Sequence, residues 1–245
     1  MLGLDMNYIV SLKKRRVRAL FNNTKSFIGD GTDDYVDCGN ADLIGTLDYS
    51  ISVWFKTSTT GSVMYVINKG FTQMYKLFSY GDKIKFEHKA GGDSVTVVST
   101  DDITDGNWHH CVVTADRDGD LTMYVDGSAE STTADLDTAN LRSDIDDTAR
   151  DLYIGSYSKF DGGSNEWNGN IDEVAIWTVV LSAADVTAIY NSGKPNNLLS
   201  ASSYNVDRTS NLVGYWRCED DFDDSSTNSN NGTAQDGATF STSVP

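Results

Sequence analysis

Four aspartates have residue types and spacings that could bind a metal ion. Asp30, Asp33 and Asp34 lie within one short stretch, and Asp172 lies in an apolar run at residues 171–177. If that run is a regular strand, Asp172 shares a face with apolar residues, so its carboxylate points toward the core, where a charge needs a partner. Calcium binds about six to eight oxygens from carboxylates and carbonyls. These four residues are therefore the predicted metal ligands, and the alternative is that they only cap turns.

A second group of side chains could contact a sugar. Tyr157, Asn165 and Trp167 lie in one Gly-rich stretch. Aromatic rings stack on the apolar face of a pyranose, and amides bind its hydroxyls. The alternative is that an aromatic side chain in such a loop plugs the edge of the fold.

The chain lacks the residue combinations that catalysis requires. Its histidines are His88, His109 and His110, and no Gly-x-Ser-x-Gly, His-Glu-x-x-His or Gly-rich phosphate-binding pattern occurs. Asp172 and Glu173 are adjacent, so on a regular strand they point to opposite faces, whereas the two carboxylates of a glycosidase face one sugar. We predict that the chain is not an enzyme and has no catalytic residues.

Charge is distributed unevenly along the chain. The 19 basic and 36 acidic residues give a net charge of −17. Residues 1–29 carry six basic residues and one acidic residue, which leaves 13 basic and 35 acidic residues, a charge of −22, for the rest. An acidic body repels phosphate backbones, so we expect no nucleic-acid binding through the main domain. The basic residues predicted to dock on a partner are Lys13, Lys14, Arg15, Arg16 and Arg18.

No apolar run approaches the roughly 18 residues that a membrane-spanning helix needs, so membrane insertion is not expected. The basic cluster follows a short apolar stretch, which is the reverse of the order in a secretory signal. Cys38, Cys111 and Cys218 are far apart in the sequence, which predicts buried free thiols rather than a disulfide framework.

Short runs with alternating apolar and polar residues predict antiparallel strands. In residues 50–56, for example, Ile51, Val53 and Phe55 share one face. Asp118-Gly119 separates two such runs and predicts a hairpin. The predicted strands are residues 50–56, 62–68, 74–79, 83–88, 94–100, 108–115, 121–125, 152–154, 171–177 and 212–217. This pattern indicates an all-β sandwich or barrel.

One helix is predicted after the last strand of the central region. Ser182 and Asp185 have capping-box spacing, and Gly193 with Pro195 supplies a stop signal. The helix is short, and we expect it to pack on the edge of the sandwich. Residues 127–150 and 220–239 are polar and Gly-rich, and are predicted to be surface loops.

Five sequence blocks, taken in order, resemble the laminin-G-like, concanavalin A-like jelly-roll family, of the kind found in phage virion proteins. The blocks are residues 29–39, 49–55, 106–110, 123–127 and 167–174. The resemblance implies a two-sheet antiparallel jelly-roll sandwich that often carries one calcium ion. It also implies binding of glycans or protein surfaces rather than catalysis. The residue before the Asp30-Gly31 turn is glycine where the family normally has an aromatic residue, so the start of that strand is expected to be irregular.

The resemblance suggests a division of the chain into three parts. Residues 1–26 form a basic N-terminal arm, residues 27–210 the laminin-G-like domain, and residues 211–245 a C-terminal segment. This last segment resembles one that normally precedes the first block. It either adds a strand to its own sandwich, which we favour, or completes a neighbouring copy.

These features predict a non-enzymatic structural or adhesion module, most plausibly a phage virion subunit such as a capsid decoration or tail-associated protein. The arm and the C-terminal tail would dock on other virion proteins, and the loop end would touch cell-surface glycans. The alternative is a carbohydrate-binding or adhesin module of a cellular surface protein. A divergent glycoside hydrolase is less favoured.

Overall fold

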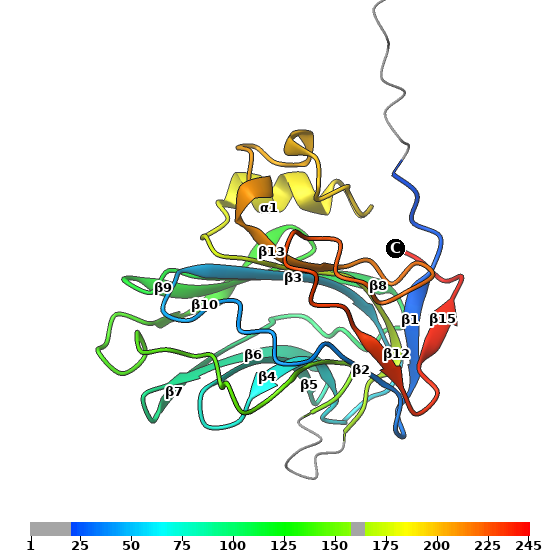
Figure 1. Ribbon diagram of the computed structural model, residues 1–245, viewed down its shortest axis with the longest axis horizontal. Coiled ribbons are helices and arrows are strands. Elements are labelled where there is room, and N and C mark those ends of the chain that lie inside the picture. The colour runs from blue at the N-terminus through cyan, green and yellow to red at the C-terminus, as the bar shows by residue number, and fades with distance from the viewer. Residues whose placement is uncertain (1–20, 158–164) are drawn as a thin grey trace, which may run out of the picture.

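The strands form two antiparallel sheets that face each other, as Figure 1 shows for the computed structural model, which describes residues 21–157 and 165–245. In spatial order, the 8-stranded sheet contains β10 (Ser128–Asp135), β9 (Asp120–Val125), β8 (Trp108–Ala115), β3 (Tyr49–Lys56), β12 (Asn168–Trp177), β1 (Ser26–Asp30) and β15 (Thr239–Ser241), and β13 (Leu212–Trp216) also pairs with β12. The 7-stranded sheet contains β14 (Thr233–Gln235), β2 (Tyr35–Asp37), β11 (Leu152–Ile154), β4 (Tyr65–Gly70), β5 (Met74–Tyr80), β6 (Lys83–Ala90) and β7 (Asp93–Val98). This all-β sandwich confirms the predicted fold class.

The core between the sheets follows from alternation within the strands. Ile51, Val53 and Phe55 of β3 all contribute to the apolar cluster between the layers, as the sequence predicts. Ile84 and Phe86 of β6 join the same cluster from the facing sheet. Each large apolar side chain that is fully buried in this way stabilises the fold by about 1.5–3 kcal/mol.

The outer face of the 8-stranded sheet is covered as well, and this corrects the expected position of the helix. The α1 helix (Ala183–Tyr190) lies over this face rather than at an edge (Figure 1). Its Val186 and Ile189 form a second apolar cluster with Ala175 and Trp177 of β12. The outward positions of β12 are therefore apolar and need a covering layer.

Capping fixes both ends of α1. The Ser182 hydroxyl accepts a hydrogen bond from the Asp185 backbone N–H (3.1 Å), and the Asp185 carboxylate accepts one from the Ser182 backbone N–H (3.2 Å). This is the predicted capping box. The helix ends at Asn191, whose left-handed φ of 49° terminates it before Gly193. Two short 3₁₀ turns follow, Ala201–Ser203 and Thr209–Asn211.

The C-terminal segment adds strands to both layers of its own sandwich. Its β13 pairs with β12 and its β15 pairs with β1, both in the 8-stranded sheet. Its β14 pairs with β2 in the 7-stranded sheet. The two chain ends that the structure describes therefore meet along β1 and β15, and the tail lies on its own copy.

The predicted loop at residues 127–150 contains a strand. β10 pairs with β9 along one side of the sheet, although most of its side chains are exposed. Its sequence is almost entirely small and polar, so it has no apolar alternation to reveal it. After β10 the chain turns inward, and Leu136, Leu141 and Ile145 are buried in the core. This segment is therefore part of the packed body.

Two further predictions from the sequence are confirmed. β8 and β9 form the hairpin predicted around Asp118-Gly119. Cys38, Cys111 and Cys218 are buried free thiols. Within the described part of the chain, no helix has the length and apolar character to cross a membrane.

Candidate functional site

Three of the four predicted metal ligands lie together at the tight connection between β1 and β2. Asp30, Asp33 and Asp34 each place a carboxylate oxygen within 4.8 Å of the others. Local hydrogen bonds shape this loop: the Thr32 backbone N–H donates to Asp30 Oδ1 (2.7 Å), and the Asp30 N–H donates to Asp34 Oδ2 (3.1 Å). The Gly31 backbone adopts a φ of 77°, which favours glycine.

The electrostatics of this loop favour a cation. Burial raises the pKa of Asp34, and the neighbouring Asp30, Asp33 and Asp236 add to the effect. Asp30 and Asp33 are exposed, and no Lys or Arg forms an ion pair with any of the three among the described residues. Carboxylate oxygens are the donors that calcium prefers, and three of them supply part of its shell of about six to eight. The donor set fits calcium in kind.

Asp172 is not part of this cluster, and a β-bulge in β12 changes the face of the strand on which it lies. Asp172 pairs with Trp54 and Ala175 with Ser52, so Glu173 and Val174 together oppose the single residue between those partners. Glu173 has a φ of 49°, as the first residue of such a bulge can. The prediction that Asp172 shares a face with Val174 was wrong, since it assumed a regular strand.

The distance along the sheet also separates Asp172 from the loop. Asp30 pairs with Asn168, which lies four residues before Asp172 on β12, about 13 Å along a strand. Asp172 is fully buried, accepts a hydrogen bond from Asn23 Nδ2 (3.0 Å) and accepts another from the Glu173 backbone N–H (2.9 Å). Burial, then the neighbouring Glu173, raises its pKa well above the usual range. It is a structural carboxyl.

Two exposed amides stand beside the aspartate loop. Gly31 lies against Asn168 so closely that a Cβ on this glycine would be 2.8 Å from the Asn168 Cβ. Asn168 and Asn165 line a hollow of about 270 Å³, which also includes Gly31. On the other side, Asn168, Asp30 and Asp34 line a second hollow of about 430 Å³. We call Asp30, Asp33, Asp34, Asn165 and Asn168 the acidic rim.

The three residues predicted to contact a ligand differ in how far they are exposed. Asn165 is exposed at the acidic rim, where its carbonyl accepts the Tyr65 N–H (3.0 Å). Tyr157 is half-buried, with its ring centroid 4.8 Å from that of Tyr65. Trp167 is fully buried, packs edge-on against Phe55 and donates from Nε1 to the Asn170 carbonyl (3.2 Å). It belongs to the core and offers no face to a sugar, so its predicted contact was wrong.

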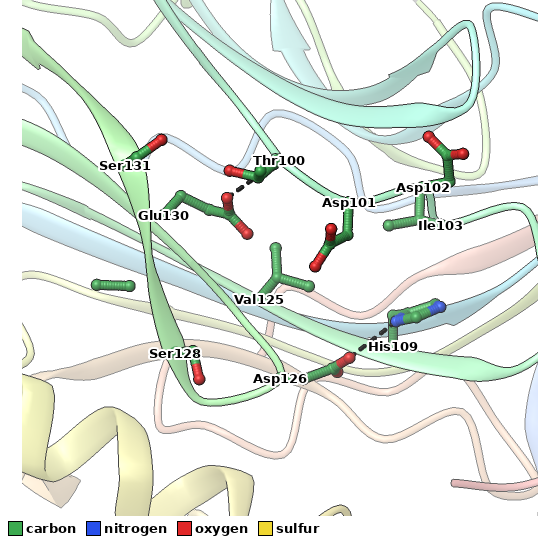
Figure 2. A pocket seen from close by; sticks show the side chains of 11 residues that line it. Thr100, Asp101, Asp102, Ile103, His109, Val125, Asp126, Ser128, Glu130 and Ser131 are labelled. Carbon is green, nitrogen blue, oxygen red and sulfur yellow. Dashed lines mark hydrogen bonds and ion pairs between the residues drawn. The ribbon is translucent and has the colours of Figure 1, made fainter.

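The sequence did not point to a third hollow, of about 460 Å³, near the β9–β10 turn (Figure 2). It lies four strand positions across the 8-stranded sheet from β1, or roughly 19 Å. Asp101 and Glu130 reach into it from opposite sides, and the Thr100 N–H donates to Glu130 (2.7 Å). We call it the His109 cleft, because His109 and Asp126 lie together along its lower side.

His109 is held between two carboxylates. Its Nδ1 lies 2.9 Å from Asp126 Oδ2, and its Nε2 lies 3.2 Å from Asp105 Oδ1. The hydrogen bond to Asp126 is the main cause that raises the pKa of His109. Burial alone would raise the pKa of Asp126, but the hydrogen bonds from His109 and from the His110 backbone outweigh it and lower the pKa. Both residues lie in blocks that resemble the jelly-roll family, but nothing in the sequence indicated that they meet.

The N-terminal segment is fastened to the body from Phe21 onward. Asn22 accepts a hydrogen bond from Arg217 through its carbonyl (2.6 Å), and the Thr24 N–H donates to Glu219 (3.0 Å). Lys25 forms an ion pair with Asp220. Residues 21–26, predicted as part of the arm, therefore lie on the sandwich. The predicted docking residues Lys13, Lys14, Arg15, Arg16 and Arg18 lie outside the described residues.

Residues 30–187 match the concanavalin A-like lectin/glucanases superfamily. The chain belongs to this superfamily. The match begins at the aspartate loop and ends within α1, so it includes every residue that lines the 270 Å³ hollow and the His109 cleft. No curated protein matches the sequence significantly.

Solved structures of the superfamily fold agree with this assignment. A Bacteroides ovatus protein whose proposed role is carbohydrate binding has a TM-score of 0.66 at 16% identity, over 90% of this chain and 60% of that one. A heptameric SAP-like pentraxin from Limulus polyphemus has a TM-score of 0.60 at 12% identity, over 89% of this chain and 94% of that one. The CBM40 of a Ruminococcus gnavus IT-sialidase has a TM-score of 0.56 at 14% identity, over 69% of this chain and all (100%) of that one. At these identities the likeness shows the fold alone.

One departure from the superfamily pattern leaves the first strand intact. The glycine at position 29 was expected to make the start of this strand irregular, but β1 pairs in continuous register with β12. A Cβ at Gly29 would lie 2.4 Å from the Trp167 carbonyl oxygen. The absence of a side chain allows this close approach, and Phe27 fills the core two residues earlier.

Proposed function

We propose that this chain is a non-enzymatic binding module that holds a glycan at the acidic rim. The observation that carries the proposal is the gathering of three carboxylates, which form no ion pair within the described part of the chain, beside two exposed amides and hollows of about 270 and 430 Å³. Amides pair with sugar hydroxyls both as donors and as acceptors. The binding-module relatives of the same fold support this type of function.

Calcium is the cofactor proposed for this site. Asp30, Asp33 and Asp34 would hold it, and a bound calcium ion would supply a positive centre able to coordinate sugar hydroxyls. Asn168 lies between the loop and both hollows, so its amide would orient the sugar from either side. Asn165 would add a second polar contact at the outer edge of the smaller hollow.

A glycan array tests this proposal with the full chain in calcium and in EDTA. Wild type is expected to bind at least one glycan, and the Asn165→Ala/Asn168→Ala variant is expected to lose at least about tenfold in affinity, since two hydrogen-bonding side chains are removed. Asp101→Asn is the matched control, because it changes an exposed polar residue in the His109 cleft. No binding by wild type, or full binding by the rim variant, would refute the proposal.

A separate experiment tests whether the chain is non-enzymatic. Incubation with the bound glycan is expected to release no reducing ends. Asp30, Asp33 and Asp34 crowd one loop and do not face one another across a hollow, as the two carboxylates of a glycosidase must. Measurable glycan cleavage that the rim variant abolishes would reassign the chain as a hydrolase.

We further propose that the module is a subunit of a phage virion, displayed as a capsid decoration or tail-associated protein. Support comes from the basic cluster at residues 13–18, which contrasts with the acidic body, and from the firm attachment of the segment that follows it. Replacing the five basic residues by Gln is expected to prevent incorporation into particles, with glycan binding unchanged. Normal incorporation would instead favour an adhesin of a cellular surface.

A further inference from the structure

The outer face of β5 and β6 carries a cluster of positive charge on a strongly acidic protein. In the register of the 7-stranded sheet, Tyr80 pairs with Lys83 and Phe78 with Lys85. Lys76 and Lys89 occupy the same face at alternate positions, while the intervening residues of both strands face the core. The body beyond residue 29 has only 13 basic residues, so four on two neighbouring strands is a concentration. We call Lys76, Lys83, Lys85, Lys89 and Tyr80 the lysine face.

Two of these lysines have no carboxylate partner among the described residues, whereas several other basic residues of the body do. Lys69, Arg208 and Arg217 are all paired with carboxylates at 2.9–3.4 Å. On the lysine face itself, Lys76 pairs with Glu87 (3.1 Å) and Lys83 with Asp102 (2.8 Å).

Among the described residues, Lys85 and Lys89 form no ion pair. Their charges are therefore free to meet an external anion.

Aromatic rings hold Lys85 in place. Its Nζ lies 5.0 Å from the Tyr80 ring centroid and 5.9 Å from that of Phe78, within the range of cation–π contacts. Tyr80 is 59% exposed, which makes it one of the few large exposed aromatic side chains of the described body. A pre-positioned ammonium beside an exposed ring suits a ligand that has both a negative group and an apolar ring face.

This face is also uncovered. Figure 1 shows α1 over the other sheet, with no described helix or strand beneath β6 and β7. The neighbouring strand β7 exposes Ser94 and Thr96 on the same side, beside Lys89 and Glu87. Ser94 thus places a hydroxyl beside Lys89, and the Glu87 carboxylate between Lys85 and Lys89 is paired with Lys76.

We propose that the lysine face binds a carboxylated glycan, with Lys85 and Lys89 meeting the carboxylates and Tyr80 stacking on a sugar ring. The two lysines are four residues apart on one strand, about 13 Å, so they reach two separated charges of one sugar chain. The net charge of −17 disfavours a dense polyphosphate such as nucleic acid. A chain with a carboxylate on only some of its rings has a lower charge density. This site does not depend on the acidic rim, which is built from other strands.

Affinity electrophoresis of the full chain tests the proposal, with polygalacturonate and hyaluronan as acidic probes and dextran as the neutral probe. We expect the two acidic polymers to retard wild type at low salt and dextran not to. Lys85→Gln/Lys89→Gln should weaken binding by about five- to tenfold, in keeping with two exposed charge contacts. Tyr80→Ser should weaken it about threefold through lost stacking.

A matched variant separates a specific face from general charge attraction. Lys56→Gln/Lys194→Gln removes the same charge elsewhere and should bind like wild type, as should the Asn165→Ala/Asn168→Ala rim variant. Equal losses in the two lysine variants, or no retardation of wild type by either acidic polymer, would overturn the proposal. Equal retardation by single-stranded DNA would also overturn it, since the ligand would then be any polyanion. If the acidic rim alone failed to bind a glycan, the retardation of wild type by the acidic polymers would not change.

Discussion

Two groups of carboxyl side chains lie in opposite environments, one at the connection between β1 and β2 and the other on β12, the strand that pairs with β1. Asp30 and Asp33 of the acidic rim are exposed. Asp172 and Glu173, which we call the buried acid pair, are 0% and 2% exposed. Water solvates the charges of the first group, whereas burial raises the pKa values of the second group, whose polar atoms need protein partners.

The partners of the buried acid pair show what it does. The Tyr215 hydroxyl donates to Glu173 Oε2, and Arg217 Nε lies 3.4 Å from Glu173 Oε1. Asn23 donates to Asp172 (3.0 Å). The pair therefore ties the N-terminal segment and β13 to β12. Buried carboxyl groups thus hold segments of the protein together, whereas the exposed carboxylates of the rim remain available to a ligand.

Breaking the buried acid pair is expected to produce the largest effect. Glu173→Ala leaves the fully buried Tyr215 hydroxyl without its acceptor and removes one of the two carboxylates beside Arg217, which keeps Glu219. We expect the free energy of unfolding to fall by about 2–3 kcal/mol, mainly because a buried hydroxyl is left without a partner. Urea unfolding followed by tryptophan fluorescence measures it.

The contrast between the buried acid pair and the acidic rim would be contradicted if Glu173→Ala lowered the free energy of unfolding no more than a substitution at an exposed residue does. Asp33→Ala at the rim provides this reference, and should change the free energy of unfolding by less than about 0.5 kcal/mol. Limited proteolysis of Glu173→Ala should also cut near Phe21 sooner than in wild type, because Arg217 holds the carbonyl of Asn22 (2.6 Å).

A smaller effect is expected from Asp172→Asn, and it depends on pH. Burial raises the pKa of Asp172 in the folded protein, so as pH rises above about 4 the unfolded chain ionises first. Stability contributed by the neutral carboxyl is present at low pH and is lost as pH rises toward the elevated folded pKa. Asn cannot ionise, so the variant should avoid this loss.

We therefore expect the variant to gain at least about 1 kcal/mol relative to wild type between pH 5 and pH 9, measured as the difference of two urea titrations. The difference between the wild-type and variant titrations cancels the contributions of distant titrating groups, including His109 and Asp126. Parallel pH profiles for the two proteins would show that Asp172 is ionised throughout, contrary to its burial.

Much of the fold could be predicted because it rests on local patterns. Alternation in β3 and the Asp118-Gly119 turn specify strand and hairpin with no need for distant contacts. β10 was missed because its partners, not its sequence, make it a strand. The helix position was missed because alternation identifies a buried face but does not show that the opposite face is also covered.

The candidate site was only partly predictable for a similar reason. Asp30, Asp33 and Asp34 are close in sequence, so they meet in one loop without further information. The error at Asp172 came from one inserted residue, the bulge at Glu173, which shifts the phase of everything before it. The His109 cleft joins residues from four segments, and only the sheet order brings them together.

The smallest effect on intrinsic stability, and the sharpest test of the rim, is expected from Asp33→Asn. In EDTA the variant should unfold within about 0.5 kcal/mol of wild type, since Asp33 is exposed and removal of one charge relieves repulsion in the loop. Calcium at about 100 times its dissociation constant should stabilise wild type by about 2.7 kcal/mol and the variant by much less. Calorimetric titration of EDTA-treated protein and the melting temperature measure both.

If wild type gives no heat and no thermal shift, the three carboxylates are a solvated turn, and the contrast with the buried acid pair reduces to one of burial alone. A calcium response lost in Asp33→Asn but kept in Asp101→Asn, its exposed counterpart in the His109 cleft, would assign metal binding to the rim.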